Sequence, residues 1–231
     1  MITAVIPVRK GSQRVKDKNL RKFADTTLLE LKIRTLLQVP EIDSVIVNTN
    51  SDEAISIVEN RIREGETRLG YQRRDEYFAS SQCSGSEFFE HLGRVTDTDV
   101  FIYAPCTSPF VSEQTIRKCI TLYLQNDTDC VSTVSAVKEF LWLNGEPLNY
   151  DPRNAPNSQD LPDVYALNFG ITIVDRDKLI KNRNIIGDKP LFYKTNDIES
   201  IDIDTPLDFF LAEQVYIKMG GIVSDISEIV L

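Results

Sequence analysis

The chain has 231 residues, 42% of them hydrophobic, which is enough to bury a full core as one domain over residues 1–231. Its 26 Lys and Arg against 35 Asp and Glu give a formal net charge of −9, so nothing in the overall charge favours nucleic acid or an anionic membrane as a partner. No stretch approaches the roughly 20 apolar residues of a membrane helix, and the N-terminal apolar run lacks the basic start of a signal peptide. We therefore expect a cytoplasmic protein.

The first quarter of the chain alternates apolar runs with helical periodicity. Residues 2–8 (ITAVIPV) predict a strand, and a polar loop leads from it to a helical pattern at 28–37. A second strand is expected at 44–49 (SVIVNT) and a second helix at 52–63. This order is typical of a strand–helix–strand unit with parallel strands.

The alternation continues as far as residue 137. Short apolar runs at 99–104 and 129–137 predict strands on either side of a helix at 112–125. Nearly continuous apolar strands are typical of parallel sheets that are buried on both faces. The sequence therefore predicts an α/β fold with a doubly wound, mostly parallel sheet, in which ligands bind at the carboxyl ends of the strands.

The pattern breaks after residue 137. Residues 138–164 are expected to form an excursion outside the core, because their second part holds four prolines and many amide and acidic residues without a period. Strands are then expected at 166–174 and near 199–203, and a last helix at 206–218. The excursion is either a lid over a site or a contact between subunits.

Basic residues crowd the loop after the first predicted strand, in IPVRKGSQRVKDKN. Five cations lie between residues 9 and 18, at the end of the strand where a polyphosphate would bind. Gly11 would let the backbone approach a ligand, the Ser12 hydroxyl could donate to a phosphate oxygen, and Arg9 could form forked, charge-assisted bonds. From composition alone, a solvated basic loop is an equal alternative.

Two carboxylates stand two residues apart in SIDIDTPLDFF. Asp202 and Asp204 are expected to project to the same face of an extended segment, where a cation would relieve their repulsion. Magnesium suits such a pair, because it accepts one or two protein carboxylates together with water and phosphate oxygens. Asp208 is assigned to capping of the helix that begins after Thr205, and Asp204 could cap it too.

A third motif, APCTSPF, runs from a strand end into a turn. Thr107 and Ser108 could donate to a ligand there, although Ser108 or Ser112 could equally cap the next helix. The four cysteines lie far apart and are expected to be reduced, mostly buried thiols. His91 has no Ser, Cys or second His at a telling spacing, so we expect a structural role for it.

Together, in this order and at this spacing, the three motifs resemble those of the CMP-sialic acid synthetases, the cytidylyltransferases that activate nonulosonic acids. The resemblance spans nearly the whole chain, and its most specific part is the signature I/L-P-A-R-x-G-S-K-x-I-P-x-K-N. It is matched here at Ile6, Pro7, Arg9, Gly11, Ser12, Lys18 and Asn19. The resemblance implies a sheet of the nucleotide-diphospho-sugar transferase type, and transfer of CMP from CTP to an acidic sugar with Mg²⁺ as cofactor.

The resemblance also implies roles for individual residues. Arg9 and Lys18 would contact the triphosphate and would be catalytic together with Asp204, while Asp202 and Asp204 would bind Mg²⁺. Ser12 and Asn19 would shape the loop and the nucleotide pocket. In RRDEYFASSQCSGSEFF, which resembles the family's R-P-x-E-L-A-x-D stretch, Ser84 and Ser86 are both candidates for a serine near the nucleotide. The excursion at 138–164 corresponds in position to the segment through which members form homodimers.

Departures from the family pattern concern the sugar. Where acylneuraminate enzymes carry L-Q-P-T-S-P, this chain has Pro105 in place of the glutamine, and R-P-N-G is reduced to ALNFG, which keeps Asn168. Thr107, Ser108 and Asn168 are the predicted substrate-binding residues. The alternatives are a related acid, such as Kdo or a phosphonate, and a non-catalytic CTP-binding regulatory homologue.

Overall fold

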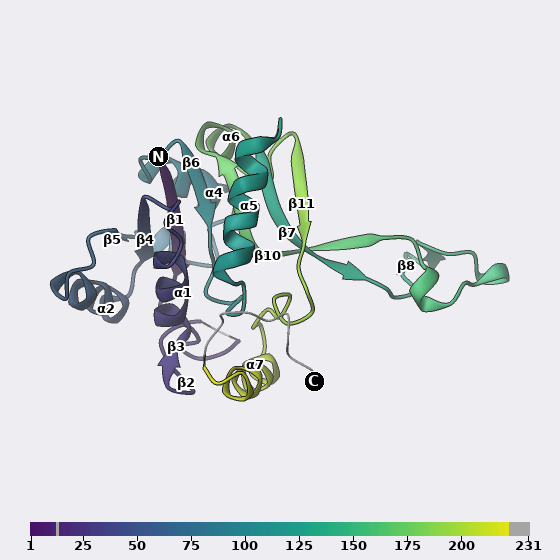
Figure 1. The fold of residues 1–231 in the computed structure, drawn as a ribbon, viewed down its shortest axis with the longest axis horizontal. Coiled ribbons are helices and arrows are strands. Elements are labelled where there is room, and N and C mark those ends of the chain that lie inside the picture. The colour runs from purple at the N-terminus through teal and green to yellow at the C-terminus, as the bar shows by residue number, and fades with distance from the viewer. Residues whose placement is uncertain (13, 222–231) are drawn as a thin grey trace.

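A computed structural model describes residues 1–12 and 14–221. Their centre is a seven-stranded sheet in the order β11-β7-β10-β6-β1-β4-β5, with helices on both faces (Figure 1). Its strands are β1 (Ile2–Val8), β4 (Ser44–Thr49), β5 (Leu69–Arg73), β6 (Val100–Tyr103), β7 (Cys130–Val137), β10 (Val164–Asp175) and β11 (Pro190–Lys194). β1 is parallel to β4 and β6, whereas β10 is antiparallel to β6 and β7. The predicted doubly wound, mostly parallel sheet is confirmed.

Two hydrophobic cores lie on opposite faces of this sheet. Along β1, Ala4 and Ile6 point into the larger core, and Val5 points into the smaller one, as expected for a strand buried on both faces. The larger core is covered by α1 (Leu28–Leu37), α2 (Asp52–Arg63), α5 (Glu113–Gln125) and α7 (Pro206–Lys218). The smaller core is covered by α4 (Gly85–Val95), which follows the short α3 (Glu76–Ala79), and by α6 (Arg176–Asn182).

Serine or threonine N-caps begin the four predicted helices. Thr27, Ser51, Ser112 and Thr205 each accept a hydrogen bond from a backbone N–H in the first turn of the helix that follows. The predicted bounds of α1, α2 and α7 agree with the structure, and α5 begins one residue later than predicted because Ser112 is its cap. Thr205 and Asp208 form a reciprocal capping box, which confirms the assignment of Asp208 to capping.

The strand predicted near 199–203 is wrong. Residues 197–200 form a turn and 201–204 an extended segment that pairs with no strand, while the edge strand of the sheet is the earlier β11, parallel to β7. The backbone of Ile203 has other partners: its N–H donates to the Thr107 carbonyl at 2.8 Å, and its carbonyl accepts from Lys18 Nζ. A loop and a side chain therefore take the hydrogen bonds that a neighbouring strand would have made.

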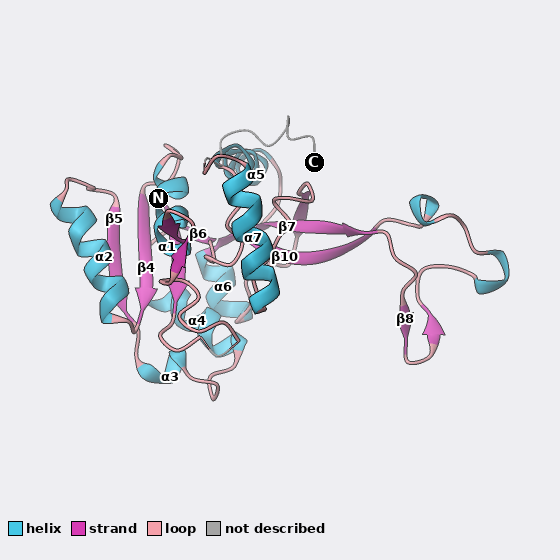
Figure 2. Cartoon of the chain, turned by 90° about the horizontal axis from the view of Figure 1, so that it is seen from below, coloured by secondary structure: helices cyan, strands magenta, loops and turns pink. Residues whose placement is uncertain are grey.

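An arm projects from the sheet between β7 and β10. The two strands pair beyond the core as a two-stranded ribbon, from Leu167 opposite Val134 to Val164 opposite Val137 (Figures 1 and 2). Beyond the ribbon lie the hairpin strands β8 (Trp142–Leu143) and β9 (Glu146–Pro147) and two 3-10 turns, Pro152–Asn154 and Ser158–Asp160. Asn144 and Gly145 join β8 to β9 with φ of 53° and 85°, as a two-residue hairpin turn requires. The predicted excursion is therefore this arm.

A small hairpin, β2 (Lys22–Phe23) with β3 (Thr26–Thr27), leads from the basic loop into α1. Phe23 packs edge-on against Phe209 and beside Tyr216, so the hairpin is fastened to α7. Among the described residues, no helix has the length and apolar character needed to cross a membrane.

Candidate active site

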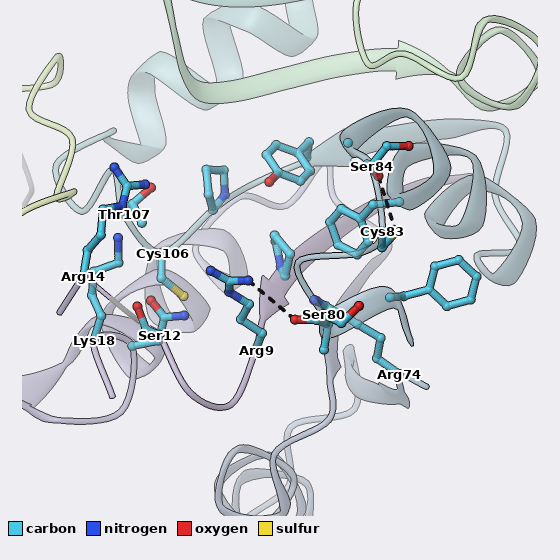
Figure 3. Close-up of a pocket in the computed structure, with 18 residues that line it drawn as sticks. Arg9, Ser12, Arg14, Lys18, Arg74, Ser80, Cys83, Ser84, Cys106 and Thr107 are labelled. Carbon is cyan, nitrogen blue, oxygen red and sulfur yellow. Dashed lines mark hydrogen bonds between the residues drawn. The ribbon is translucent and has the colours of Figure 1, made fainter. Parts of the chain in front are cut away.

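A cavity of about 500 Å³ opens at the carboxyl ends of β1 and β6. Three segments line it: the loop after β1, the segment from Arg74 to Phe88, and the turn that follows β6. Figure 3 shows Arg9 near the centre, with Lys18, Arg14 and Thr107 on one side and Ser80, Cys83 and Ser84 on the other. The cavity thus lies where ligands bind in doubly wound sheets.

The loop after β1 contributes the basic side of the cavity. Arg9, Ser12, Arg14, Lys18 and Asn19 all line it. Gly11 has a φ of +75°, a conformation that strains any residue with a Cβ, so glycine is needed for the path of the loop. The Asn19 Oδ1 atom is buried and has no hydrogen-bond partner among the described residues, so it is available to accept a bond from a ligand.

Lys18 joins this loop to the acidic segment 185 residues further along the chain. The side chain is 9% exposed, and its Nζ donates to the Ile203 carbonyl and lies 3.7 Å from Asp204 Oδ1. Arg14 Nη2 lies 2.9 Å from the same oxygen. Burial lowers the pKa of Lys18, and the nearby Asp204 and Asp202 charges oppose that effect. The basic loop is therefore part of a charged cluster and is not a freely solvated surface.

Asp202 and Asp204 flank the buried Ile203, so the extended segment turns both side chains away from the core. Desolvation raises the pKa of Asp202, and the negative charge of Asp204 raises it further. A hydrogen bond with the Thr107 side chain lowers this pKa and so offsets part of the rise. By contrast, backbone and hydroxyl donors of Thr205 lower the pKa of Asp208. Neither carboxylate lines the cavity itself; Asp204 is joined to it through Arg14 and Lys18, which do line it. Asp202 and Asp204 repel each other, whereas the carboxylate of Asp208 is occupied by capping.

This pair fits the coordination chemistry of Mg²⁺. One carboxylate oxygen of Asp204 is held by cations, and the raised pKa of Asp202 indicates a position where a further positive charge would be stabilising. Residues 1–12 and 14–221 contain no group of three or more His, Cys, Asp or Glu side chains that could hold a metal. An ion bound here would take most of its ligands from water and phosphate, as Mg²⁺ does.

In the wall opposite the basic loop, the segment RRDEYFASSQCSGSEFF was predicted to lie near the nucleotide, but the part played by Arg74 was not. Arg74 is 4% exposed, and its Nε and Nη2 donate to the side-chain and backbone oxygens of Asn48, each at 2.6 Å. Its guanidinium lies 4.5 Å from the ring centroid of Phe88, and burial lowers its pKa to about 10. Phe78 and Tyr103 complete this aromatic wall. Two sequence signals pointed to Arg74: its place at the start of RRDEYFASSQCSGSEFF, and its position directly after a strand, which the irregular pattern LGYQR made hard to recognise.

The structure brings some predicted residues to the cavity and not others. Ser84 lines it while serving as N-cap of α4, with Glu87 completing the capping box, whereas Ser86 is exposed on α4 outside the lining. Thr107 lines the cavity, but Ser108 is buried behind it, with its carbonyl accepting from Lys32 Nζ at 2.7 Å.

Asn168 also lies outside the cavity lining. Its side chain donates to Ser135 Oγ and Thr195 Oγ1 and accepts from Thr133 Oγ1, at 2.7–3.0 Å. These bonds hold the irregular part of β10, where the register with β7 shifts after Leu167. In the single chain, Asn168 therefore has a structural role: its hydrogen bonds hold β10 to its neighbours at the base of the arm.

The sulfur-bearing and imidazole side chains agree with their predicted roles. All four cysteines are free, and Cys106, Cys119 and Cys130 are buried. Cys106 lines the cavity, and burial raises its pKa to about 12, so it is a neutral thiol. His91 stacks on Phe78 at 3.6 Å between ring centroids and thus supports the cavity wall from behind.

Comparison with solved structures identifies the class of fold. The 4-diphosphocytidyl-2C-methyl-D-erythritol synthase of Anaerococcus prevotii aligns with a TM-score of 0.69 over 94% of this chain and 96% of its own, at 16% identity. A CMP-2-keto-3-deoxy-manno-octonic acid synthetase complexed with CTP aligns with a TM-score of 0.66 over 94% and 99%, also at 16% identity. The chain therefore shares its fold with these two proteins.

The chain belongs to the cytidylyltransferase family, whose profile matches residues 3–155. It is 28% identical to the N-acylneuraminate cytidylyltransferase of Escherichia coli O18:K1:H7 over 91% of this chain and 51% of that protein. It is 27% identical to the CMP-N,N'-diacetyllegionaminic acid synthase of Legionella pneumophila over 93% and 95%. The chain spans about half the length of several N-acylneuraminate cytidylyltransferases that it matches. The resemblance to CMP-sialic acid synthetases predicted from the motifs is confirmed.

Proposed function

We propose that this protein transfers CMP from CTP to an acidic sugar of the nonulosonic type and releases pyrophosphate. The observation that carries the proposal is a basic cavity, lined by Arg9, Arg14 and Lys18, in a chain of the cytidylyltransferase family. The acidic segment is joined to this cavity through Asp204, which lies 2.9 Å from Arg14 and 3.7 Å from Lys18. Two relatives named for acylneuraminate and legionaminic acid substrates support this class of acceptor.

In the proposed reaction, the hydroxyl on the anomeric carbon of the sugar attacks the α-phosphorus of CTP. A new P–O bond forms, the bond to the bridging oxygen breaks, pyrophosphate leaves, and the hydroxyl proton passes to solvent. Arg9 lies in the cavity where its guanidinium can bind phosphate oxygens, and Ser12 and the backbone around Gly11 offer further donors. Fixed donors of this kind favour the transition state, because negative charge builds up on the leaving group.

We further propose that the reaction uses Mg²⁺ held by Asp202 and Asp204. The ion would supply positive charge against the phosphates. Arg14 and Lys18 orient the Asp204 carboxylate from the protein side, and the Thr107 carbonyl fixes the segment through the Ile203 N–H. No His or thiol is needed for these roles, so the neutral Cys106 and the stacked His91 take no part.

The acceptor is assigned only to a class of acid. Thr107 is the predicted substrate contact at the cavity. Ser108 and Asn168 do not line the cavity and would affect the substrate only by supporting the turn after β6 and the sheet. Pro105 lines the cavity where the acylneuraminate pattern has glutamine, and Ala166–Leu167 stand where that pattern has Arg-Pro. These differences support an acceptor whose substituents differ from those of N-acetylneuraminate.

We propose that two copies associate through the arm, in the cytoplasm. Large apolar side chains on and near the arm are exposed in the single chain: Phe140, Trp142, Leu143, Leu148, Tyr165 and Leu167. Large apolar side chains that are exposed together on a projecting segment favour a contact with another protein. The free, buried thiols agree with a reducing compartment.

The test measures pyrophosphate release with CTP, Mg²⁺ and a panel of acids. The panel holds several nonulosonic acids, Kdo and a phosphonate, and each reaction is repeated with EDTA. We expect release with at least one nonulosonic acid and none with EDTA. Binding of CTP without release across the panel would contradict the proposal and favour a regulatory CTP-binding protein.

A further inference from the structure

Lys32 is a buried cation that the reaction above does not use. It lies on the inner face of α1 and is 1% exposed, between the core residues Leu31 and Ile33 of the same helix. An apolar side chain of similar length would bury there without the cost of desolvating an ammonium group. The lysine therefore has a role beyond filling the core.

The contacts of Lys32 lead to the cavity. Its Nζ donates to the Ser108 carbonyl at 2.7 Å, and it forms no ion pair among the described residues. Ser108 follows Thr107, whose carbonyl accepts from the Ile203 N–H at 2.8 Å. Ile203 stands between Asp202 and Asp204. The Thr107–Ser108 turn is therefore held by Lys32 on one side and holds the acidic pair on the other.

The charges around Lys32 also point to the acidic pair. Burial lowers its pKa to about 8, and Cys106, Glu199 and Asp202 oppose that effect, so the group remains mostly cationic at neutral pH. The Cys106 thiol is neutral, and Glu199 already accepts from the Ser112 N–H and hydroxyl at 3.0 and 2.7 Å. Asp202, a member of the acidic pair, is therefore one of the charges that help to keep Lys32 protonated.

Resting on the proposed function, we propose that Lys32 is a positioning residue, which holds the Thr107–Ser108 turn so that Asp202 and Asp204 meet the metal–nucleotide complex in the right geometry. It touches no reacting atom. Lys18 holds the acidic segment directly, through the Ile203 carbonyl, whereas Lys32 acts on it through the Thr107–Ser108 turn. Removing Lys32 should therefore loosen the metal site more than the fold.

The test compares Lys32→Met with the control Leu36→Met, an equally buried position on the same helix. Loss of a residue that orients a metal site typically costs about 10–100-fold in activity or metal affinity. We expect Lys32→Met to lower kcat by about that factor and to raise the Mg²⁺ concentration for half-maximal rate, with a melting temperature equal to or above that of the wild type. Leu36→Met should leave kcat and the Mg²⁺ requirement unchanged.

A second readout does not depend on turnover. The rise in melting temperature caused by CTP is measured with Mg²⁺ and with EDTA, and the Mg²⁺-dependent part should shrink in Lys32→Met alone. Wild-type kcat and Mg²⁺ response in Lys32→Met would overturn the proposal. If the wild type turns over no acid but shows the Mg²⁺-dependent rise in melting temperature, the proposed function fails. The proposal for Lys32 is then tested by that rise alone: a smaller rise in Lys32→Met supports it, and an equal rise overturns it. If the wild type shows neither turnover nor this rise, both proposals are overturned.

Discussion

At the scale of single residues, the candidate site depends on a few charged groups whose surroundings differ sharply. Arg9 reaches into the open cavity, whereas Lys18 is buried against the Ile203 carbonyl. The same cationic chemistry therefore serves two purposes: Arg9 is available to a ligand, and Lys18 holds the acidic segment in place. Each purpose leads to a different expected result on substitution.

Arg9→Ala should lower kcat by about 10²–10³-fold, because loss of one preorganised donor to the transition state has that effect. The melting temperature should stay close to that of the wild type, since Arg9 lies in a loop and its side chain makes only one hydrogen bond to residues 1–12 and 14–221, a bond of 3.5 Å to the Ala79 carbonyl. Steady-state pyrophosphate release and thermal melting measure the two effects. Lys16→Ala, in the same loop but outside the cavity, is the control and should be fully active. Normal turnover of Arg9→Ala would refute its catalytic role.

Asp204→Asn separates metal binding from helix capping. We expect a higher Mg²⁺ requirement and a lower kcat with little loss of stability, because the capping carboxylate is that of Asp208. The matched variant Asp208→Asn should lose about 1 kcal/mol of stability and keep its Mg²⁺ response. Chemical unfolding and Mg²⁺ titration of the rate distinguish the two. The assignment of Asp204 to metal binding fails if Asp204→Asn loses stability but keeps the Mg²⁺ requirement and kcat of the wild type.

Lys32 should also make the free energy of unfolding depend on pH. Its pKa is about 8 in the folded chain, below the 10.5 of a free lysine, so between these values the unfolded chain binds more protons. Stability from this group therefore rises with pH across that window, by at most about 3 kcal/mol at 1.36 kcal/mol per pKa unit. Urea unfolding of wild type and Lys32→Met at pH 7.5 and 9.5 measures it. From pH 7.5 to 9.5 the wild type should gain stability relative to Lys32→Met, and an unchanged difference between the two proteins would contradict the burial of a cation.

At the scale of elements, the cavity wall depends on how closely α4 packs against α6. Gly93 of α4 has no side chain, and a Cβ there would lie 2.7 Å from Ile180 Cγ1 and 3.2 Å from Leu179 Cδ2. In sequence, a glycine inside a helix only weakens the helix. In the structure, it lets the two helices approach and so supports the wall that α4 contributes.

Gly93→Ala should therefore destabilise the protein. Alanine favours a helix over glycine by about 1 kcal/mol, but overpacking typically costs 1–3 kcal/mol, so we expect a net loss of about 1 kcal/mol. Gly85→Ala, at the start of the same helix, is the control, because its Cβ would meet nothing closer than 4.0 Å. Urea unfolding should show a loss for the first variant and none for the second. If Gly93→Ala is as stable as Gly85→Ala, α6 can shift to accept the added methyl group, and the prediction of close packing at Gly93 is wrong.

At the scale of the whole molecule, the arm is the part that the core does not explain. It leaves the sheet between β7 and β10 and carries exposed aromatic and aliphatic side chains well away from the two cores (Figure 1). Within the arm, Trp142 Nε1 donates to the Tyr150 hydroxyl at 2.9 Å, and Tyr150 packs on Phe140. These contacts fix the hairpin, while Trp142, Leu143 and Leu148 stay exposed in the single chain.

Leu143→Glu should weaken the proposed dimer. Leu143 is 59% exposed on β8, and its burial in an interface would contribute about 1.5–3 kcal/mol in each copy, which a charged side chain would forfeit. Leu124→Glu is the control, because Leu124 is 62% exposed on α5, away from the arm. Light scattering at several concentrations should show dimers for wild type and Leu124→Glu, and monomers at low concentration for Leu143→Glu. A monomeric wild type would refute association through the arm.

The local elements and the family were readable from sequence, because they follow from local patterns. Strand β1, the helices α1, α2 and α7 and the arm all appear where periodicity, capping residues and proline content predicted them. The basic loop could also be recognised from sequence as a candidate phosphate site, because its glycine and its cations lie within a few residues of each other. Such features depend on neighbours in the chain and need no knowledge of what packs against them.

The tertiary structure decided which distant residues meet. Only folding brings Lys18 to Ile203, Lys32 to Ser108 and Arg74 to Phe88. It also decided that residues 199–203 form no strand, because their backbone groups find a loop and a lysine as partners in place of a neighbouring strand. The IPVRKGSQRVKDKN loop by itself was equally consistent with a solvated surface, and it became one side of a charged cavity because the sheet places it against the acidic segment. Contacts of this kind depend on the packing of the whole chain, which no local pattern contains.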